Sequence, residues 1–210
     1  MAGLRVEQYV VGPVMTNCYF AVNEETGETL VIDPGDSAKR LIGKLKERKL
    51  APVAVLLTHG HFDHASAAKE VAAEFGIKIY AYEKERETLE NPRINLSGML
   101  GNGDQVYHAD VYVKDGEQLA LAGFSIQVLH TPGHTKGGCC YYFPKEQAVF
   151  SGDTLFCGSV GRSDFPGGSA STLVRSIKER LMDLPGQTKV YPGHDDVTTI
   201  GWERQNNPFL

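Results

Sequence analysis

The chain has 210 residues, a hydrophobic content of 41% and a formal net charge of -5 at pH 7, which allows one domain with a sizeable buried core. The acidic balance argues against non-specific binding to nucleic acid, because such binding requires basic patches. No apolar run approaches the roughly 18 to 20 residues that cross a bilayer, and the N-terminus lacks the basic-then-apolar pattern of a secretory signal, so we expect a cytoplasmic protein without membrane contact.

The N-terminal part of the chain is rich in β-branched and aromatic residues, in short runs separated by turn-forming residues. These runs predict an antiparallel meander of three strands, at residues 6–11, 17–22 and 29–32. A helix is then predicted from Ser37, which is placed to cap it, to about Lys49, with apolar residues along one face.

The most distinctive segment follows a wholly apolar run at residues 53–57, which predicts a buried strand. Residues 58–64 read Thr-His-Gly-His-Phe-Asp-His. Imidazole and carboxylate groups suit zinc, iron or manganese, and so many potential ligands in one turn exceed what a single tetrahedral site uses. The segment therefore indicates a metal site with ligands for two metals. A histidine-rich surface turn is the less favoured interpretation.

The centre of the chain combines regular and irregular stretches. A second helix is predicted from near His64 to Gly76, because glycine suits the C-terminus of a helix, and a strand follows at residues 77–82. Residues 91–108 are rich in glycine and look irregular. They form either a lid near the metal site or, as such segments more commonly do, a plain surface connection.

A second series of strands is predicted at residues 111–113, 117–120, 124–130, 139–143, 148–151 and 189–191. Residues 172–182 carry apolar side chains on one face and predict a helix. Two strand-rich halves with one-sided helices predict an α/β fold in which two sheets pack face to face and helices cover their outer faces. No linker or low-complexity tract divides the chain, so residues 1–210 are expected to form one domain.

Three further polar motifs lie just past the ends of predicted strands. They are Thr-Pro-Gly-His-Thr with His134, Ser-Gly-Asp-Thr with Asp153, and Pro-Gly-His-Asp with His194. Glycine beside each polar residue lets the backbone turn tightly. Because active sites commonly collect on loops at one end of a sheet scaffold, we expect these three loops to converge with residues 58–64.

Through these motifs, and through Asp33 in Val-Ile-Asp-Pro-Gly, the chain resembles the metallo-β-lactamase superfamily over nearly its whole length. The resemblance implies a four-layer αββα sandwich and two divalent metal ions, with zinc favoured over iron or manganese. The ligands that it implies are His59, His61 and His134 for one metal, Asp63, His64 and His194 for the other, and Asp153 between them. Asp33 matches a position that supports the ligands from behind, and a turn former before Pro34 is an equally good interpretation.

The ligand set separates members of the superfamily. True β-lactamases of this fold lack the bridging aspartate, so Asp153 counts against antibiotic hydrolysis, and flavin-linked diiron reductases usually carry glutamate in place of His61. The chain is most similar to the glyoxalase II group, the hydroxyacylglutathione hydrolases, and to its short bacterial relatives. That resemblance implies hydrolysis of a small thioester, such as an S-(2-hydroxyacyl)glutathione, by a hydroxide that bridges two metals. It implies that Asp63 and Asp153, as metal ligands, position this hydroxide.

Two departures from the glyoxalase II pattern concern the substrate. Full-length enzymes continue into a helical domain that helps to hold glutathione, whereas this chain stops soon after His194, so we expect that domain to be absent. Asp196 stands where those enzymes commonly carry a tyrosine that contacts glutathione. Arg162 falls where they often place a basic substrate contact, although an ion pair with Asp164 is at least as good an interpretation.

Three other functions stay open. One is a persulfide dioxygenase that uses a single iron, and another is a hydrolase of some other small ester or lactone. The third is a non-catalytic module in which metals only stabilise the fold. The complete second ligand set, including His194, favours two metals and hydrolysis.

The cysteines and the remaining histidines are assigned no role in the site. The chain has four cysteines, Cys18, Cys139, Cys140 and Cys157. Their spacing fits neither a zinc finger nor an ordinary disulfide framework, so we expect free thiols packed like small apolar residues. His108 and His130 are expected to be ordinary surface or core histidines.

Overall fold

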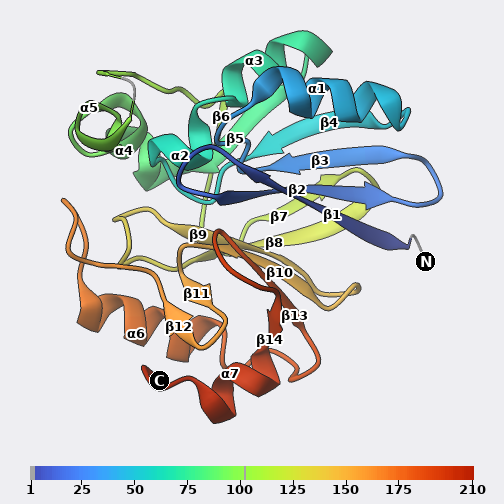
Figure 1. Ribbon diagram of the computed structural model, residues 1–210. Helices are drawn as coiled ribbons and strands as arrows, with labels where there is room; N and C mark the ends of the chain where they lie inside the picture. Colours follow the sequence, from blue (N-terminus) through green and yellow to red (C-terminus); the bar gives the residue numbers. More distant parts are fainter. Residues whose placement is uncertain (1–2, 102) are drawn as a thin grey trace.

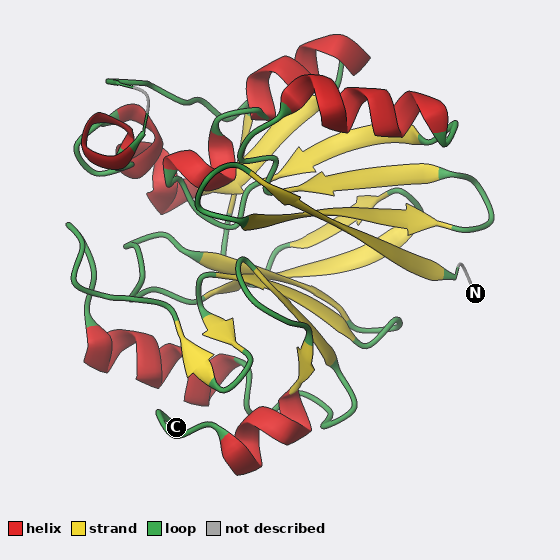
Figure 2. Ribbon diagram, viewed as in Figure 1, coloured by secondary structure: helices red, strands yellow, loops and turns green. Residues whose placement is uncertain are grey.

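The structure, a computed structural model, describes residues 3–101 and 103–210. Two sheets of six strands lie face to face (Figure 1). Helices α1 (Ala38–Glu47) and α3 (Ala68–Phe75) cover the outer face of one sheet, and α6 (Ala170–Arg180) and α7 (Ile200–Asn206) cover the outer face of the other (Figure 2). The predicted four-layer αββα sandwich is confirmed. In the described part of the chain, every helix is too short or too polar to cross a membrane.

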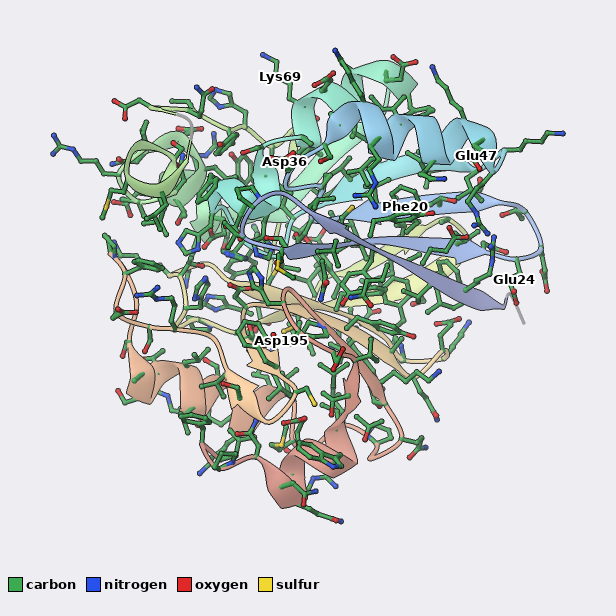
Figure 3. The ribbon with its side chains drawn as sticks, viewed as in Figure 1. Phe20, Glu24, Asp36, Glu47, Lys69 and Asp195 are labelled. Atoms are coloured by element: carbon green, nitrogen blue, oxygen red, sulfur yellow. The ribbon has the colours of Figure 1, made fainter. Side chains whose placement is uncertain are left out.

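The first sheet carries the predicted N-terminal meander along one edge. Its strands lie in chain order: β1 (Leu4–Val11), β2 (Thr16–Asn23), β3 (Glu28–Ile32), β4 (Ala51–Leu56), β5 (Lys78–Tyr82) and β6 (Val111–Val113). The first three pair antiparallel, and the strands from β3 to β6 pair parallel, with α1 and α3 as crossovers. Alternate side chains of β2 point to opposite faces, so Phe20 packs beneath α1 (Figure 3) and Tyr19 faces the second sheet.

The second sheet has the strand order β14-β13-β10-β9-β8-β7. Its strands are β7 (Gln118–Leu121), β8 (Phe124–His130), β9 (Cys139–Phe143), β10 (Ala148–Gly152), β13 (Lys189–Pro192) and β14 (Thr198–Thr199), and β11 (Leu155–Phe156) pairs with β12 (Ser159–Val160) as a separate hairpin. The sequence did not predict β11, β12, β14 or α7. Strands of 2 residues and a helix of 7 are too short to show a clear periodic pattern.

Three apolar layers hold the sandwich together. The central layer between the sheets is rich in aromatic side chains, among them Tyr141, Phe143 and Phe150. A second layer fills the space under α1 and α3, and a third lies between the second sheet and α6 and α7. Because burying one such side chain stabilises the fold by roughly 1.5–3 kcal/mol, this core gives the loops at its edge a rigid support.

The predicted helix from His64 to Gly76 is in fact two helices, α2 (Phe62–Ala65) and α3. The backbone N–H of Ala67 donates to the carbonyl of Pro34 at 2.9 Å, and Gly35 packs directly on the carbonyl of Asp63, so this turn bonds to another loop instead of continuing the helix. Gly76 ends α3 with a φ of 65°, as predicted.

Ser37 precedes α1 but does not cap it with its side chain, contrary to the prediction. Its backbone is left-handed, with a φ of 57°, and its hydroxyl donates to Asp36 at 2.9 Å. A capping serine requires extended backbone, which would aim the hydroxyl at the first free N–H groups of the helix.

Residues 91–108 are more regular than predicted. They follow a 3-10 turn, η1 (Glu83–Glu85), and α4 (Arg86–Glu90), and they contain the short helix α5 (Ser97–Leu100). The buried side chain of Asn95 organises the segment, because its amide donates to the carbonyls of Leu89 at 3.1 Å and Gln105 at 2.9 Å. A one-turn helix has no periodic signal, and the lid interpretation stays a prediction.

The four cysteines are free thiols, as predicted. Cys18, Cys139 and Cys140 are buried, and burial raises the pKa of each thiol. Cys157 is exposed, contrary to the expectation that all four would pack as apolar residues, because it lies in the turn between β11 and β12.

Candidate metal centre

The predicted metal ligands meet at one edge of the sandwich. Strands β8, β10 and β13 point the same way, since β9 runs antiparallel to both β8 and β10 and β13 runs parallel to β10. The loops after these strands carry His134, Asp153 and His194, and the loop after β4 carries residues 58–64. The carbonyl of Thr58 accepts from the backbone N–H of Cys139 at 2.9 Å and so joins the two sheets at this edge.

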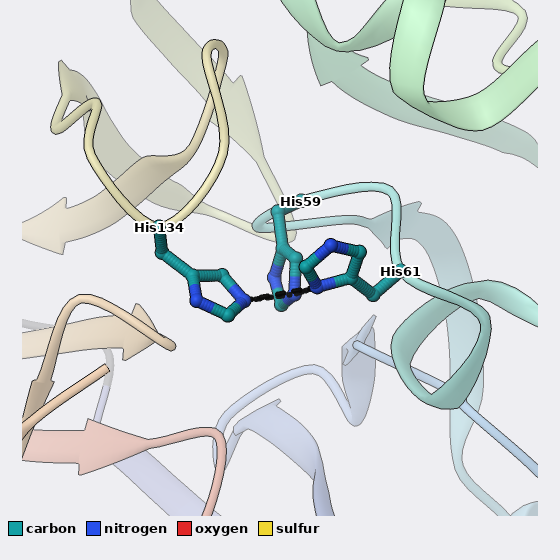
Figure 4. A group of neighbouring side chains, drawn as sticks. All are labelled: His59, His61 and His134. Carbon is teal, nitrogen blue, oxygen red and sulfur yellow. Dashed lines mark hydrogen bonds between the residues drawn. The ribbon is translucent and has the colours of Figure 1, made fainter. Parts of the chain in front are cut away.

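The first cluster consists of three imidazole rings whose nitrogens face one another (Figure 4). His59 Nε2 lies 3.1 Å from His61 Nδ1 and 3.2 Å from His134 Nε2, and the nitrogens of His61 and His134 are 2.9 Å apart. Burial and the neighbouring imidazoles lower the pKa of His59 well below its ordinary range and that of His61 to about 3. The rings are therefore neutral at pH 7, which is the form that binds metals.

For two of the three rings, His134 and His59, a neighbouring group fixes which nitrogen faces the cluster. His134 donates its Nδ1–H to the backbone carbonyl of Arg162 at 2.6 Å, so its Nε2 presents a lone pair to the other two rings. His59 Nδ1 lies 3.2 Å from the hydroxyl of Thr58. Partners of this kind orient metal-binding imidazoles in other proteins.

The second cluster consists of Asp63, His64 and His194. Asp63 Oδ2 lies 3.5 Å from His64 Nε2 and 3.4 Å from His194 Nε2. Burial opposes ionisation of Asp63, but His64 and the hydrogen bonds that its carboxylate accepts outweigh burial and lower its pKa to about 2. This carboxylate therefore carries its charge at neutral pH and suits a cation.

Asp153 lies between the two clusters. Its Oδ1 is 3.2 Å from His64 Nε2, and its Oδ2 is 3.4 Å from His134 Nε2 and 3.6 Å from His194 Nε2. Both Asp153 Oδ1 and His64 Nε2 are buried and make no hydrogen bond to the described residues. Since buried polar atoms normally have partners, the arrangement fits metal ions that would satisfy them. Asp153 also forms a third ligand group with His59 and His64.

Asp33 lies behind the second cluster. Its carboxylate accepts from the N–H of Thr58 at 2.8 Å, from the Thr58 hydroxyl at 2.7 Å and from His64 Nδ1 at 2.9 Å. The backbone of Asp33 is also left-handed, with a φ of 50°, as a turn former requires. Both interpretations of this residue are thus compatible with the structure, and the bond to His64 leaves His64 Nε2 directed at the cluster.

Sequence reasoning missed two residues at the start of β2. The hydroxyl of Thr16 donates to Asp63 Oδ2 at 2.8 Å. The side-chain amide of Asn17 donates to the carbonyls of Pro192 at 3.1 Å and Asp195 at 2.9 Å, and so holds the loop that carries His194. The signal that could have found them is a polar pair directly before the apolar run of residues 18–22.

Glu85 is a third residue that the sequence did not reveal. It is fully buried, and its carboxylate accepts from the N–H of Gly60 at 2.7 Å, the N–H of Gly137 at 2.8 Å and the hydroxyl of Thr135 at 2.6 Å. Burial raises the pKa of Glu85, and these hydrogen bonds partly offset the rise. The carboxylate ties the 58–64 loop to the loop between β8 and β9.

A pocket of about 430 Å³ opens over both clusters. Phe165 stands edge-on to His61, with ring centroids 6.0 Å apart, and Phe156 stands edge-on to His194 at 5.9 Å. Arg162 also lines the pocket, and its guanidinium donates to both carboxylate oxygens of Asp164, at 2.8 Å and 2.7 Å. The ion pair that was the alternative interpretation of Arg162 is therefore formed.

Neither of the other histidines joins the site. His108 is exposed on the surface, and the ring of His130 stacks on Tyr82 with centroids 4.3 Å apart. Both are ordinary surface or packing histidines, as predicted. Asp196 is exposed and makes no contact that connects it to the clusters in the described residues.

Comparison with known proteins gives a family match over most of the chain. Residues 11–194 match the family model described as the metallo-beta-lactamase superfamily. "Probable metallo-hydrolase YqgX" of Bacillus subtilis is 39% identical over 201 residues, which cover 95% of this chain and 94% of the relative. "Hydroxyacylglutathione hydrolase GloC" of Haemophilus influenzae is 37% identical over 209 residues, which cover 99% of this chain and 98% of the relative.

Solved structures also match over nearly the whole chain. BLEG-1, described as a B3 metallo-beta-lactamase, is 41% identical to this chain and superposes with a TM-score of 0.93. The match covers 98% of this chain and 99% of the BLEG-1 chain. TTHA1623, solved in a di-iron-bound form, is 36% identical with a TM-score of 0.87 and covers 97% of this chain and 100% of its own. ETHE1 from Myxococcus xanthus is 30% identical with a TM-score of 0.80 and covers 97% of this chain and 83% of its own.

Proposed function

The chain belongs to the metallo-beta-lactamase superfamily, and on that premise we propose that it is a dinuclear metal-dependent hydrolase that cleaves a small thioester. The proposed ligands are His59, His61 and His134 for one metal, Asp63, His64 and His194 for the other, and Asp153 for both. One observation carries the proposal: two groups of three converging ligand atoms meet at the carboxylate of Asp153. Asp153 Oδ1 and His64 Nε2 are buried and make no hydrogen bond within the described part of the chain, which supports a metal beside them.

The donor set fits several metals. Imidazole and carboxylate ligands suit zinc, iron and manganese alike, and we propose zinc as the resident metal. The di-iron form of TTHA1623 supports iron as the alternative.

Bound divalent ions would lower the pKa of a coordinated water to about 7 and polarise the acyl carbonyl of the substrate. The residues of the chain prepare the site for this chemistry. Asp63 and Asp153 offset part of the positive charge of two ions, and the neutral rings of His59 and His61 offer lone pairs. Asp63 acts as a ligand and not as a general base, since it lies within a complete group of ligand atoms.

The relatives support the choice of a thioester. GloC of Haemophilus influenzae is described as a hydroxyacylglutathione hydrolase, so an S-(2-hydroxyacyl)glutathione such as lactoylglutathione is the first substrate to test. BLEG-1 is described as a metallo-beta-lactamase, so a β-lactam belongs in the same panel, although Asp153 argues against that activity. A simple lactone and an oxygen ester complete the panel.

The test measures metal content and hydrolysis on one sample. We expect two metal ions per chain and turnover of thioesters in preference to the lactone, the ester and the β-lactam. His194→Ala is expected to remove about one ion per chain and to lower kcat/KM for thioesters by about 100-fold, because a ligand of one metal is lost. His108→Ala, a change at an exposed histidine away from the clusters, serves as the control. A two-metal protein that hydrolyses no thioester would contradict the proposal.

A second candidate is an iron-dependent persulfide dioxygenase with a single metal. It is favoured by the group formed by His59, His64 and Asp153, which offers enough ligands for one ion, and by the likeness to ETHE1. One iron per chain in protein purified without added metal, together with oxygen consumption on glutathione persulfide, would establish this function in place of the hydrolase.

A further inference from the structure

The pocket over the metal centre has apolar walls on both sides. Phe62, Leu96 and Leu100 come from the helices beside the first sheet, and Phe156, Val160 and Phe165 come from the β11–β12 hairpin and the loop after it. In Figure 1 these two groups of elements lie in opposite halves of the sandwich. Leu100 is 57% exposed at the mouth of the pocket. Exposed apolar side chains that continue into a pocket are typical of a ligand-binding groove.

The charges around this pocket leave no free cation among the described residues. Arg162 is the only basic residue in its wall other than the cluster histidines, and its guanidinium is paired with Asp164 and stacks on Phe165 at 3.9 Å. The hydrogen bonds from Arg162 lower the pKa of Asp164 to about 2, so this carboxylate is charged at neutral pH and can hold the guanidinium. Nearby, Lys136 is paired with Glu87 at 3.1 Å and does not line the pocket.

Apart from Asp63 and Asp153 of the clusters, one further acidic residue among those described lines the wall. Asp195 lies on the loop after β13 (Figure 3), next to His194 in the chain, and this exposed residue lines the pocket. An anionic thiol carrier such as glutathione would bring its carboxylates next to this carboxylate, and no unpaired Lys or Arg side chain of the described residues lines the wall to receive them. Bringing like charges together, or burying a carboxylate without a partner, lowers affinity.

We propose that the pocket selects thioesters whose non-reacting part is apolar and uncharged, and that it disfavours anionic carriers such as glutathione. This inference rests on the proposed function, since it names the class of thioester that the same site takes. Leu100 and its apolar neighbours contribute affinity through burial, and the Arg162–Asp164 pair and Asp195 set the preference for an uncharged molecule. Each methylene that the pocket buries is expected to tighten binding by about fourfold.

Binding of thioethers tests the inference without any reaction. Thioethers cannot be hydrolysed, so S-methyl, S-butyl and S-hexyl derivatives of N-acetylcysteamine and of glutathione can be compared by calorimetry on the metal-loaded protein. We expect Kd to fall with chain length in the neutral series and S-hexyl-N-acetylcysteamine to bind about tenfold more tightly than S-hexylglutathione. Equal or tighter binding of S-hexylglutathione, or no effect of chain length, overturns the inference.

Three variants separate the contributions of burial and charge. Leu100→Ser is expected to weaken S-hexyl-N-acetylcysteamine about fivefold, whereas Val106→Ser, an equally exposed site in the same segment but outside the pocket, leaves its affinity unchanged. Asp164→Asn releases the charge of Arg162 and is expected to tighten S-hexylglutathione about threefold or more, because a free guanidinium can then receive a carboxylate. An unchanged affinity in both Leu100→Ser and Asp164→Asn contradicts the inference.

Hydrolysis of the matching hexanoyl thioesters distinguishes this inference from the proposed function. If neither thioester is cleaved while the neutral thioether still binds more tightly, the proposed function fails and the pocket preference stands. If both are cleaved and the glutathione thioester has the higher kcat/KM, the function stands and the inference fails.

Discussion

At the scale of single residues, the centre depends on side chains that stand behind the ligands. His64 and His134 each donate one ring N–H to a fixed acceptor, the carboxylate of Asp33 and the carbonyl of Arg162. Each ring therefore directs its other nitrogen at a cluster. Such partners commonly raise metal affinity because they fix both the tautomer and the orientation of the ring.

Asp33→Asn is expected to weaken metal binding. The asparagine amide would turn an N–H toward either Thr58 or His64, both of which need an acceptor. The expected result is a loss of about 10- to 100-fold in affinity for one of the two ions, measured by competition with a chromogenic chelator. Asp36→Asn, three positions further along the same loop, is the matched control, since Asp36 accepts only from Ser37 in the contacts described. Equal metal affinity in the two variants would show that Asp33 serves only as a turn former.

At the scale of elements, the loops of the centre approach one another so closely at some glycines that a residue with a side chain would not fit there. A Cβ on Gly35 would lie 1.4 Å from the carbonyl oxygen of Asp63, and a Cβ on Gly193 would lie 2.2 Å from Asp153 Oδ1. Glycine is therefore required at these positions by contact with a neighbouring loop. The close approach brings ligands from four loops within reach of one another.

Gly193→Ala is expected to reduce metal binding, whereas Gly43→Ala is expected to stabilise the fold. The methyl group of the first would displace the carboxylate of Asp153 and the ring of His64, so we expect the protein to lose bound metal. Gly43 lies in the middle of α1 with nothing within 4 Å of a Cβ, and alanine there is expected to stabilise the fold by about 0.5–1 kcal/mol. Metal analysis and urea unfolding measure the two effects, and normal metal content in Gly193→Ala would refute the first.

Glu85→Gln is expected to loosen the link between two loops. Both carboxylate oxygens accept hydrogen bonds, from Gly60 on one side and from Thr135 and Gly137 on the other, so a glutamine amide must turn its N–H groups against a donor. The expected loss is about 1–3 kcal/mol in the free energy of unfolding, measured with urea. Glu87→Gln, whose only described contact is an exposed pair with Lys136, is expected to change this energy by less than about 0.5 kcal/mol. Similar losses in the free energy of unfolding for both variants would show that Glu85 does not hold the two loops together.

At the scale of the whole molecule, the centre joins the two halves of the sandwich. Residues 58–64 follow a strand of the first sheet, whereas His134, Asp153 and His194 follow strands of the second. Asn17 adds a direct link, since its backbone N–H donates to the carbonyl of Gly193 at 2.7 Å. Metals held between these loops would therefore stabilise the packing of one sheet on the other as well as the site.

Removal of metal is expected to lower the thermal stability of the whole chain. A ligand present at about 1,000 times its Kd stabilises the folded state by about 4 kcal/mol, and for a domain of this size each kcal/mol shifts Tm by about 2–4 °C. We therefore expect Tm to fall by about 8–16 °C after chelation and to recover when zinc is returned. His108→Ala should show the full shift, because His108 lies on the exposed surface outside the clusters. An unchanged Tm in protein shown to be metal-free would mean that the loops hold their places without ions.

Local patterns accounted for much of the fold. Alternation and periodicity placed the long strands and the helices α1 and α6, and the order of these elements indicated two sheets between helices. Glycine-bordered polar residues at strand ends are visible within a few positions, and the predicted ligands were named from the family resemblance that these motifs carry. The structure brings all seven of them together at one edge.

Only the tertiary structure decided the contacts between residues that lie far apart in the chain. Ala67 leaves the helix because its N–H is taken by Pro34, and Asn17 finds its partners in the His194 loop. The buried place of Glu85 depends on two loops that no local pattern connects to it. The pairing of Arg162 with Asp164 at the pocket wall likewise depends on the orientation of two side chains, which no local pattern fixes. Sequence by itself therefore determined the class of fold and the residues that could bind metal, whereas the shape and charge of the pocket arise from packing between distant segments.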